Sequence, residues 1–330
     1  MTNEMDKIFF GSLPEKYKAI VEDFFEGYIK VIKSSGRSAV DYLPFFETFL
    51  ELIKKQLQSP YEFGHFHKAI REPFDYYHFG IEFLRPLIDL EHSTVLGWEN
   101  LAAIEHQLQE GHNVILLANH QIEADPQAIS ILIEKVHPKL AEEMIFVAGD
   151  RVTSDPLAVP FSLGRNLLCI YSKKYIDTPP EDKLKKQLHN KKTMETMSML
   201  LEKGGKCIYV APSGGRDRPD ENGKVRIAAF DDKSIEMFYL MTKKSKSIAH
   251  FYPLALATYK ILPPPQAIQV ELGEQRKTEG GSIHLGVGKE MDMENFPGSE
   301  ETDKGKKRRL RRDFIFKQVS GLYEKLTAKL

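Results

Sequence analysis

The sequence predicts an α/β protein, with a mixed sheet flanked by helices on both faces and a small N-terminal helical bundle domain in front of it. Short, continuous apolar runs alternate with helical stretches from about residue 98 onward, and amphipathic helical periodicity dominates the first 75 residues. Strands that are apolar throughout are typical of sheets covered on both faces. A composition of 42% apolar and 28% charged residues over 330 positions can bury a core of this size.

Two domains are predicted: a helical bundle over residues 1–75 and the α/β domain over residues 76–330. Apolar residues recur at three- and four-residue spacing over 17–32 and again over 43–57, which indicates one buried face on each of two helices. A third helical segment is predicted near residues 63–70.

The order of the elements predicts the α/β region. A helix over 98–109 ends near Gly111, and a buried strand over 114–118 follows it. The other predicted helices span 126–136, 184–203 and 231–243, and the other predicted strands span 144–148, 167–172, 207–211, 251–257, 267–272 and 282–287.

Composition excludes several classes of protein. Lysine and arginine (46) balance aspartate and glutamate (47), so no overall positive field indicates a nucleic-acid binder. The apolar runs are far shorter than the roughly 20 residues that span a bilayer. Cys169 and Cys207 are predicted to be buried thiols, because both lie in apolar runs and no Cys-x-x-Cys spacing occurs.

The N-terminal segment predicts a cytoplasmic protein. It mixes Glu4, Asp6 and Lys7 and has no continuous apolar core, so neither a secretory signal nor a transit peptide is visible. The small number of cysteines fits a reducing compartment.

His120 is the strongest candidate for chemistry, because it directly follows a predicted strand. Active sites of open α/β sheets form beyond the carboxyl ends of the strands. Asp125, five residues later, can fold back onto the imidazole and leave the other ring nitrogen to accept a proton from an alcohol. The alternative is structural: Asp125 and Pro126 also fit a helix N-cap followed by the proline of the first turn.

Two further strand ends carry cations. The loop over 211–219 contains paired glycines together with Arg216 and Arg218, and it suits a phosphate because glycines let backbone N–H groups approach an anion. Lys173 and Lys174 follow another predicted strand. Either group alone could be a solvated surface turn. Together with His120, these arginines and lysines predict general-base chemistry on an anionic substrate without metal or cofactor. The Gly-x-Ser-x-Gly nucleophile elbow, the Walker phosphate-binding loop, the dinucleotide-binding glycine pattern and the zinc-binding histidine patterns are all absent from the sequence.

These motifs resemble the soluble glycerol-3-phosphate 1-O-acyltransferases of plastid and chlamydial type. The resemblance covers roughly residues 95–290, and the N-terminal helical segment would correspond to the family's small helical domain. The pattern His120-x4-Asp125 is similar to the family's acyltransferase signature, and the segments 147–152, 164–174, 211–219 and 252–256 resemble its further blocks in the same order.

The resemblance implies transfer of a fatty acyl group from acyl-carrier protein, or from acyl-CoA, to the sn-1 hydroxyl of glycerol 3-phosphate, the first step of phospholipid synthesis. It implies that His120 is the general base and Asp125 its orienting partner. It also implies that Lys174, Arg216 and Arg218 bind the substrate phosphate.

One position departs from the family pattern. Plastid members tend to have histidine after the phosphate-binding lysine, whereas this chain has Tyr175, which carries no positive charge at pH 7 and is left out of the predicted site. Met1 and the missing transit segment favour a bacterial, chlamydia-like protein. Two alternatives stay open: an acyltransferase acting on lysophosphatidate, and a noncatalytic module that binds carrier protein or membrane.

A basic segment near the C-terminus predicts an acidic partner. Cations at a helix start oppose the helix dipole, which favours a binding role over a solvated helix start. We expect this segment to bind acyl-carrier protein, assisted by lysines between residues 183 and 192, with an anionic membrane surface as the alternative. The basic residues are Lys304, Lys306, Lys307, Arg308, Arg309, Arg311 and Arg312.

Overall fold

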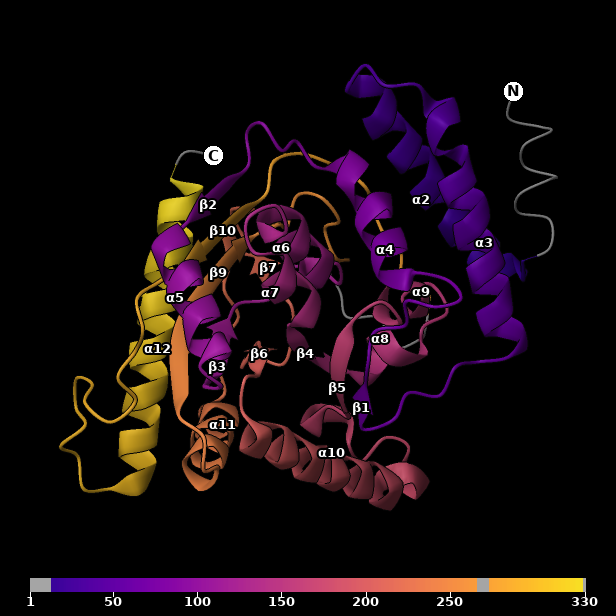
Figure 1. The fold of residues 1–330 in the computed structure, drawn as a ribbon. Coiled ribbons are helices and arrows are strands. Elements are labelled where there is room, and N and C mark those ends of the chain that lie inside the picture. Colours follow the sequence, from indigo (N-terminus) through magenta and orange to yellow (C-terminus); the bar gives the residue numbers. More distant parts are fainter. Residues whose placement is uncertain (1–12, 266–272, 329–330) are drawn as a thin grey trace.

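An eight-stranded mixed sheet forms the centre of the protein (Figure 1). The computed structural model describes residues 13–265 and 273–328, apart from the side chain of Lys174. The predicted fold class is confirmed. In sheet order the strands are β1 (Phe66–His67), β5 (Asn166–Ile170), β4 (Ile145–Gly149), β6 (Cys207–Val210), β3 (Asn113–Ala118), β9 (Ala249–Ala257), β10 (His284–Val287) and β2 (Thr94–Leu96).

The five central strands from β5 to β9 run parallel. β1 runs antiparallel to β5 and β10 runs antiparallel to β9, whereas β2 pairs parallel with β10. Every residue of β3 is buried. Because side chains alternate along a strand, Val114, Leu116 and Ala118 enter one core and Ile115 and Leu117 enter the other. The apolar run that predicted this strand therefore reflects a sheet covered on both faces.

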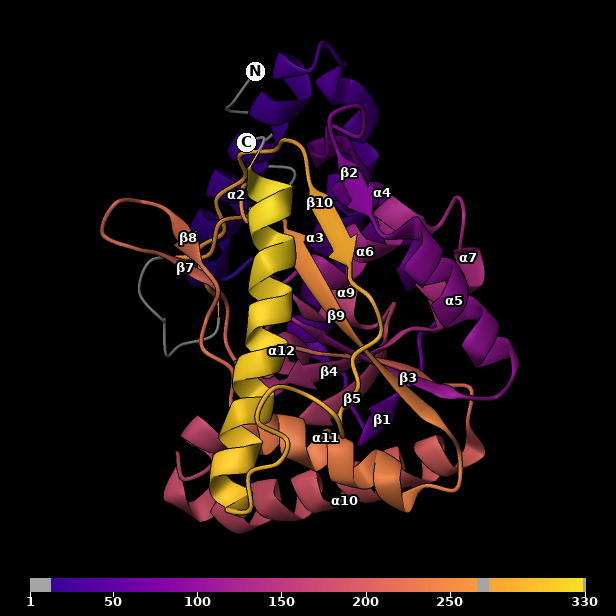
Figure 2. The same ribbon diagram turned by 90° about the vertical axis from the view of Figure 1, so that its left-hand side faces the viewer.

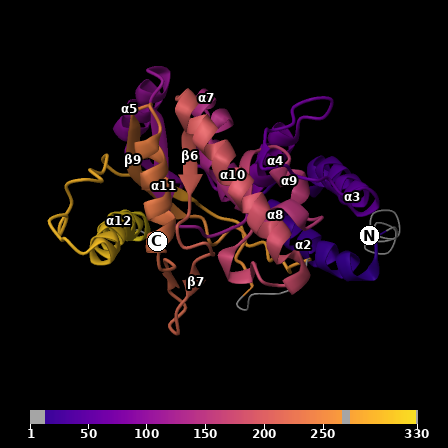
Figure 3. The same cartoon turned by 90° about the horizontal axis from the view of Figure 1, so that it is seen from below.

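Helices cover the two faces of the sheet. On one face lie α5 (Trp98–Gln109), α6 (Asp125–Ile133) and α7 (Pro138–Glu143), which share a core with Val114 and Leu116. On the other lie α10 (Lys183–Lys203), α11 (Asp232–Lys244) and α12 (Lys304–Thr327). Figure 2 shows α12 running along β9 and β10. In Figure 3, α5 and α12 lie on opposite sides of β9.

The N-terminal helices pack through aromatic side chains. They are α2 (Glu15–Ser34), α3 (Leu43–Gln58) and α4 (Tyr76–Leu84). The rings of Phe24 and Phe46 lie 6.1 and 5.2 Å from the ring of Phe83. The same core includes Ile122 and Ala128 of the α/β region, so the bundle and the sheet region are packed together. The domain boundary between residues 75 and 76 stays a prediction.

The helix predicted at residues 63–70 is wrong. Phe66 and His67 form β1, which pairs antiparallel with Leu167 and Leu168 of β5. Apolar residues in so short a segment fit either structure, and a partner about 100 positions away decided it. The third helix of the N-terminal group is α4. It is apolar on nearly all sides because it is enclosed between α6 and α9 (Val159–Ser162).

The other elements lie close to their predicted positions. The helix over 98–109 is α5 and the helix over 184–203 is α10, and both differ from their predicted ends by at most one residue. The strand predicted at 267–272 lies outside the described residues. Cys169 and Cys207 are buried free thiols, as predicted, and burial raises both of their pKa values to about 12.

Candidate active site

His120 and Asp125 meet at the carboxyl end of β3. Nδ1 of His120 lies 2.7 Å from Oδ2 of Asp125. Because the carboxylate can only accept, Nδ1 carries the proton and Nε2 is left with a free lone pair. The side chain of His120 is 28% exposed, whereas that of Asp125 is 1% exposed. This geometry provides an oriented imidazole that a substrate can reach.

The structure does not place Asp125 at the N-cap of α6. Asp125 is the first residue of α6, and Ala124 occupies the N-cap. The Asp125 carboxylate turns back and accepts from the backbone N–H of Gln121 (2.8 Å), while its other oxygen accepts from the hydroxyl of Thr258 (2.6 Å). Asp125 therefore fixes the His120 turn rather than the start of the helix.

Arg216 lies in the loop after β6, near the same end of the sheet, and Arg218 begins the short strand β7 (Arg218–Pro219) that follows this loop. Arg216 Nη2 donates to both carboxylate oxygens of Glu274 at 2.6 Å, and Nη1 lies 3.8 Å from Oε1 of Glu123. Arg218 forms no ion pair with any described residue. Burial, together with the positive charge of Arg216, lowers the pKa of Arg218. A half-buried guanidinium without a carboxylate is a natural partner for a bound anion.

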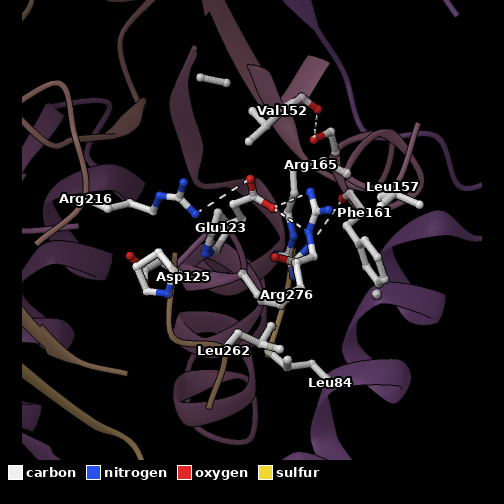
Figure 4. Close-up of a pocket in the computed structure, with 18 of the residues that line it drawn as sticks. Leu84, Glu123, Asp125, Val152, Leu157, Phe161, Arg165, Arg216, Leu262 and Arg276 are labelled. Atoms are coloured by element: carbon white, nitrogen blue, oxygen red, sulfur yellow. Dashed lines mark hydrogen bonds and ion pairs between the residues drawn. The ribbon is translucent and has the colours of Figure 1, made fainter. Parts of the chain in front are cut away.

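One pocket joins His120, Asp125 and Arg216 to an apolar cavity (Figure 4), whereas Arg218 is not among the residues that line it. His120, Glu123, Arg216 and Arg276 form its polar part. The apolar part comes from the N-terminal helices, β4 and the segment around α9, and includes Phe24, Phe49, Phe83, Phe146, Leu157 and Phe161. Such a pocket suits a ligand that has a long apolar chain and a polar reacting end.

Comparisons with known proteins agree with this chemistry. A family model described as "Acyltransferase" matches residues 99–256. A chloroplastic glycerol-3-phosphate acyltransferase of Cucurbita moschata is 42% identical over 294 residues, which are 88% of this chain and 64% of the relative. The Arabidopsis thaliana protein of the same name is 36% identical over 323 residues, which are 97% of this chain and 70% of the relative. The chain belongs to the glycerol-3-phosphate acyltransferase family.

The acyltransferase resemblance seen in the sequence is thereby confirmed. The chain spans about two thirds of the length of these relatives. Among solved structures, the match to the 1-acyl-sn-glycerophosphate acyltransferase PlsC of Thermotoga maritima covers 97% of both chains, with a TM-score of 0.38 and 14% identity.

The predicted cytoplasmic location is contradicted. The relatives from Cucurbita moschata, Arabidopsis thaliana and Spinacia oleracea are all named as chloroplastic proteins. The prediction came from the composition around Glu4 and Lys7. Cellular location is encoded in targeting segments, and amino-acid composition by itself does not report it.

The structure does not place every predicted phosphate ligand of the acyltransferase. Lys174 belongs to the 3-10 turn Lys173–Tyr175, but its side chain lies outside the described part of the chain. Tyr175, which is not part of the predicted site, is exposed. No group of three or more His, Cys, Asp or Glu side chains within residues 13–265 and 273–328 could hold a metal ion. Across the same residues, no helix is long and apolar enough to cross a bilayer.

Sequence reasoning missed a buried network of charges around Glu123. Oε2 of Glu123 accepts from Nε of Arg276 at 3.0 Å and forms an ion pair with Nη2 at 2.8 Å, and Nη2 donates to Asp155 at 3.2 Å. Figure 4 shows Glu123 between Arg216 and Arg276. Burial alone would raise the pKa of Glu123, but the two guanidinium groups outweigh it and the pKa is lowered. Glu123 therefore stays charged beside the site.

Glu123 stands inside the motif that singled out His120, so its position was a usable signal. Glu274 and Arg276 were not detectable in this way. They lie 154 and 156 positions after His120, in a polar segment without a motif. Only the folded chain brings Arg276 to the pocket and Glu274 to Arg216.

Proposed function

We propose that this chain transfers a fatty acyl group from acyl-carrier protein to the sn-1 hydroxyl of glycerol 3-phosphate. The observation that carries the proposal is the His120–Asp125 pair, which lies in the wall of an apolar pocket with Arg216 beside it. Family membership supports the same reaction. An acyl chain fits the apolar part of the pocket, and the phosphate fits the guanidinium groups.

The mechanism follows from the hydrogen bonds around His120. Nε2 takes the proton of the sn-1 hydroxyl while the hydroxyl oxygen attacks the thioester carbonyl carbon. The tetrahedral oxyanion collapses, the C–S bond breaks, and the imidazolium returns its proton to the departing thiolate. Asp125 stabilises the imidazolium between these steps through its bond to Nδ1. Lys174, Arg216 and Arg218 hold the phosphate, so that the hydroxyl lies near Nε2.

The test offers acyl-carrier-protein thioester with three acceptors: glycerol 3-phosphate, lysophosphatidate and glycerol. We expect consumption of glycerol 3-phosphate and a loss of about 10²–10⁴-fold in His120→Ala. Acylation of lysophosphatidate alone would instead support the alternative acceptor. Binding of the donor without turnover on any acceptor would support a noncatalytic module.

The proposed donor is an acidic protein and needs a basic surface on which to dock. The basic segment of α12 is the candidate for this surface. Its members are already partly engaged: Arg308 pairs with Asp232, and Arg311 is buried and stacks 4.0 Å from the ring of Tyr239. Asp303 caps the helix by accepting from Lys306 N at 2.6 Å, which offsets the unfavourable dipole contact. Among the described residues, Lys304, Lys307 and Arg309 have no ion-pair partner.

The three side chains without ion pairs give a sharper docking test than the whole segment. Replacing Lys304, Lys307 and Arg309 with Gln should raise KM for acyl-carrier-protein donors and reduce its salt dependence, while KM for acyl-CoA changes less. Replacing Arg311 would disturb packing and is avoided. An unchanged salt slope would reject carrier-protein docking here, and binding to anionic vesicles that disappears in the variant would support the membrane alternative.

A further inference from the structure

Asp217 is a fully buried carboxylate that the reaction outlined above does not use. It stands between Arg216 and Arg218 and is 0% exposed. Its Oδ2 accepts from Nδ2 of Asn119 at 2.7 Å and from Nε2 of Gln121 at 3.2 Å. These two residues flank His120 in the chain, so the carboxylate holds the catalytic turn from both sides.

The backbone of Asp217 adds a third contact. Its N–H donates to the carbonyl oxygen of His120 at 2.7 Å. The other carboxylate oxygen, Oδ1, accepts from the N–H of Ala228 at 2.9 Å, which secures the far end of the same loop. The loop that carries both arginines is thus joined to the turn that carries the imidazole through one residue.

The side-chain amides of Asn119 and Gln121 are held in one orientation by their hydrogen bonds. Oδ1 of Asn119 accepts from Leu256 N at 2.8 Å, and Oε1 of Gln121 accepts from Thr258 N and Tyr259 N at 2.7 and 2.9 Å. Both oxygens are therefore committed to the end of β9, and both NH2 groups must face position 217. A group that only accepts is required there, and an ionised carboxylate meets that requirement.

We propose that Asp217 is a positioning residue that aligns His120 with the substrate hydroxyl and keeps Arg216 and Arg218 in register with it. The inference rests on the proposed acyltransferase function. Asp217 contacts neither reacting group and acts through the backbone of His120 and through Asn119 and Gln121. Burying a charge here is costly, which is the pattern expected of a group retained for function rather than for stability.

Asp217→Asn tests the proposal because it keeps size and shape. The new side chain can still accept from Ala228 N, but it then directs its NH2 group at two other donors. We expect kcat to fall about 100-fold, with KM for the acyl donor within about twofold of wild type. Asp220→Asn is the matched control: Asp220 accepts from Asn222 N and Lys224 N in the exposed hairpin turn of the same loop and should leave kcat unchanged.

A second variant separates positioning from simple damage. In Gln121→Glu combined with Asp217→Asn, the acid and the amide exchange places, which restores a donor–acceptor pair between the two positions and keeps the net charge. We expect this swap to regain about tenfold in kcat over Asp217→Asn alone. Circular dichroism and thermal melts establish that each variant is folded.

Three results would overturn the inference. The first is an Asp217→Asn variant that keeps more than half of the wild-type kcat, and the second is a folded swap variant whose kcat does not recover. The third is an Asp217→Asn chain that is unfolded at the assay temperature, which would make the residue purely structural. The proposed function fails separately. A wild-type protein that does not acylate glycerol 3-phosphate rejects both proposals, whereas an active wild type with an equally active Asp217→Asn rejects only this one.

Discussion

The negative charge of Asp125 contributes to the proposed reaction beyond the hydrogen bonds that the side chain accepts. Asp125 accepts from His120 Nδ1, from Gln121 N and from the Thr258 hydroxyl, and an asparagine could satisfy only part of this set. Its ionised form also stabilises the imidazolium that forms during transfer.

Asp125→Asn should therefore lower kcat strongly, because the amide leaves the imidazolium without a counter-charge and can favour the wrong tautomer. We expect a loss of about 10³–10⁴-fold, by analogy with other His–carboxylate pairs. Single-turnover kinetics with acyl-carrier-protein thioester measures it. A variant that melts earlier but turns over normally would reduce Asp125 to a structural role.

Arg216 and Arg218 should differ in their effects, although the sequence treats them as a pair. Arg216 is already held by Glu274, whereas Arg218 forms no ion pair with a described residue. We expect Arg218→Ala to raise KM for glycerol 3-phosphate by an amount equivalent to about 1.5–3 kcal/mol, and Arg216→Ala to add misplacement of Glu274 and Glu123. Glycerol, which lacks the phosphate, is the control acceptor and should not respond to Arg218→Ala.

Acidification should affect activity and stability in opposite directions through Asp217. Burial, with a smaller contribution from Asp125, raises its pKa to about 6. Protonation below about pH 6 turns one oxygen into a donor that faces Asn119 and Gln121, so kcat should fall there. The pH profile of kcat for wild type and Asp217→Asn measures this; a wild-type profile that is flat through this range would contradict it.

The stability effect has the opposite sign. Between the unfolded pKa of about 4 and the folded pKa of about 6, the folded chain holds a proton that the unfolded chain has lost. The cost of the buried charge is therefore fully present above about pH 6 and absent below about pH 4. Relative to Asp217→Asn, the wild type should gain up to about 3 kcal/mol of unfolding free energy on acidification across this window.

At the level of elements, α4 belongs both to the N-terminal helical group and to the wall of the pocket. It is a helix of the N-terminal group by position, yet Gly80 and Phe83 line the same pocket as His120. A Cβ on Gly80 would lie 3.4 Å from Nε2 of Gln127 and 3.7 Å from Cδ1 of Phe161, which is ordinary contact. The space at this position therefore accepts a Cβ, and the further carbons of a larger side chain would take up room beside Gln127 and Phe161, which line the pocket.

Gly80→Val should shift the preference of the enzyme toward shorter acyl chains. Under the proposed function the acyl chain occupies the apolar part of the pocket, and the added methyl groups shorten or narrow it. We expect kcat/KM for long-chain donors to fall about tenfold relative to medium-chain donors. Gly321→Val is a matched control, because Gly321 lies on α12 with no atom within 4 Å of an added Cβ. Equal losses for all donors would contradict the prediction.

At the level of the whole molecule, the core of the bundle extends into the α/β region. The cluster around Phe46 and Phe83 continues into Ile122 and Ala128, next to the catalytic turn. The domain division predicted at residue 75 therefore has a testable consequence, because a shared core favours a single cooperative transition.

Phe46→Ala should destabilise the entire chain rather than the bundle alone. Phe46 is 0% exposed, and its ring lies 4.8 Å from that of Tyr28 and 5.2 Å from that of Phe83. We expect a loss of about 3–5 kcal/mol, seen as one shifted transition in calorimetry. Two separate transitions, with only the first displaced, would support a bundle that unfolds on its own.

The sequence by itself determined the local features: the buried strands, the helices between them, and the five-residue spacing of His120 and Asp125. Each depends on neighbours within a few positions, so periodicity and spacing suffice to predict it. Tertiary structure decided the rest. Arg276 reaches the pocket beside Glu123, β1 becomes a strand, and Asp217 contacts the catalytic turn only because the fold brings together residues about 100 or more positions apart. No local pattern encodes those contacts.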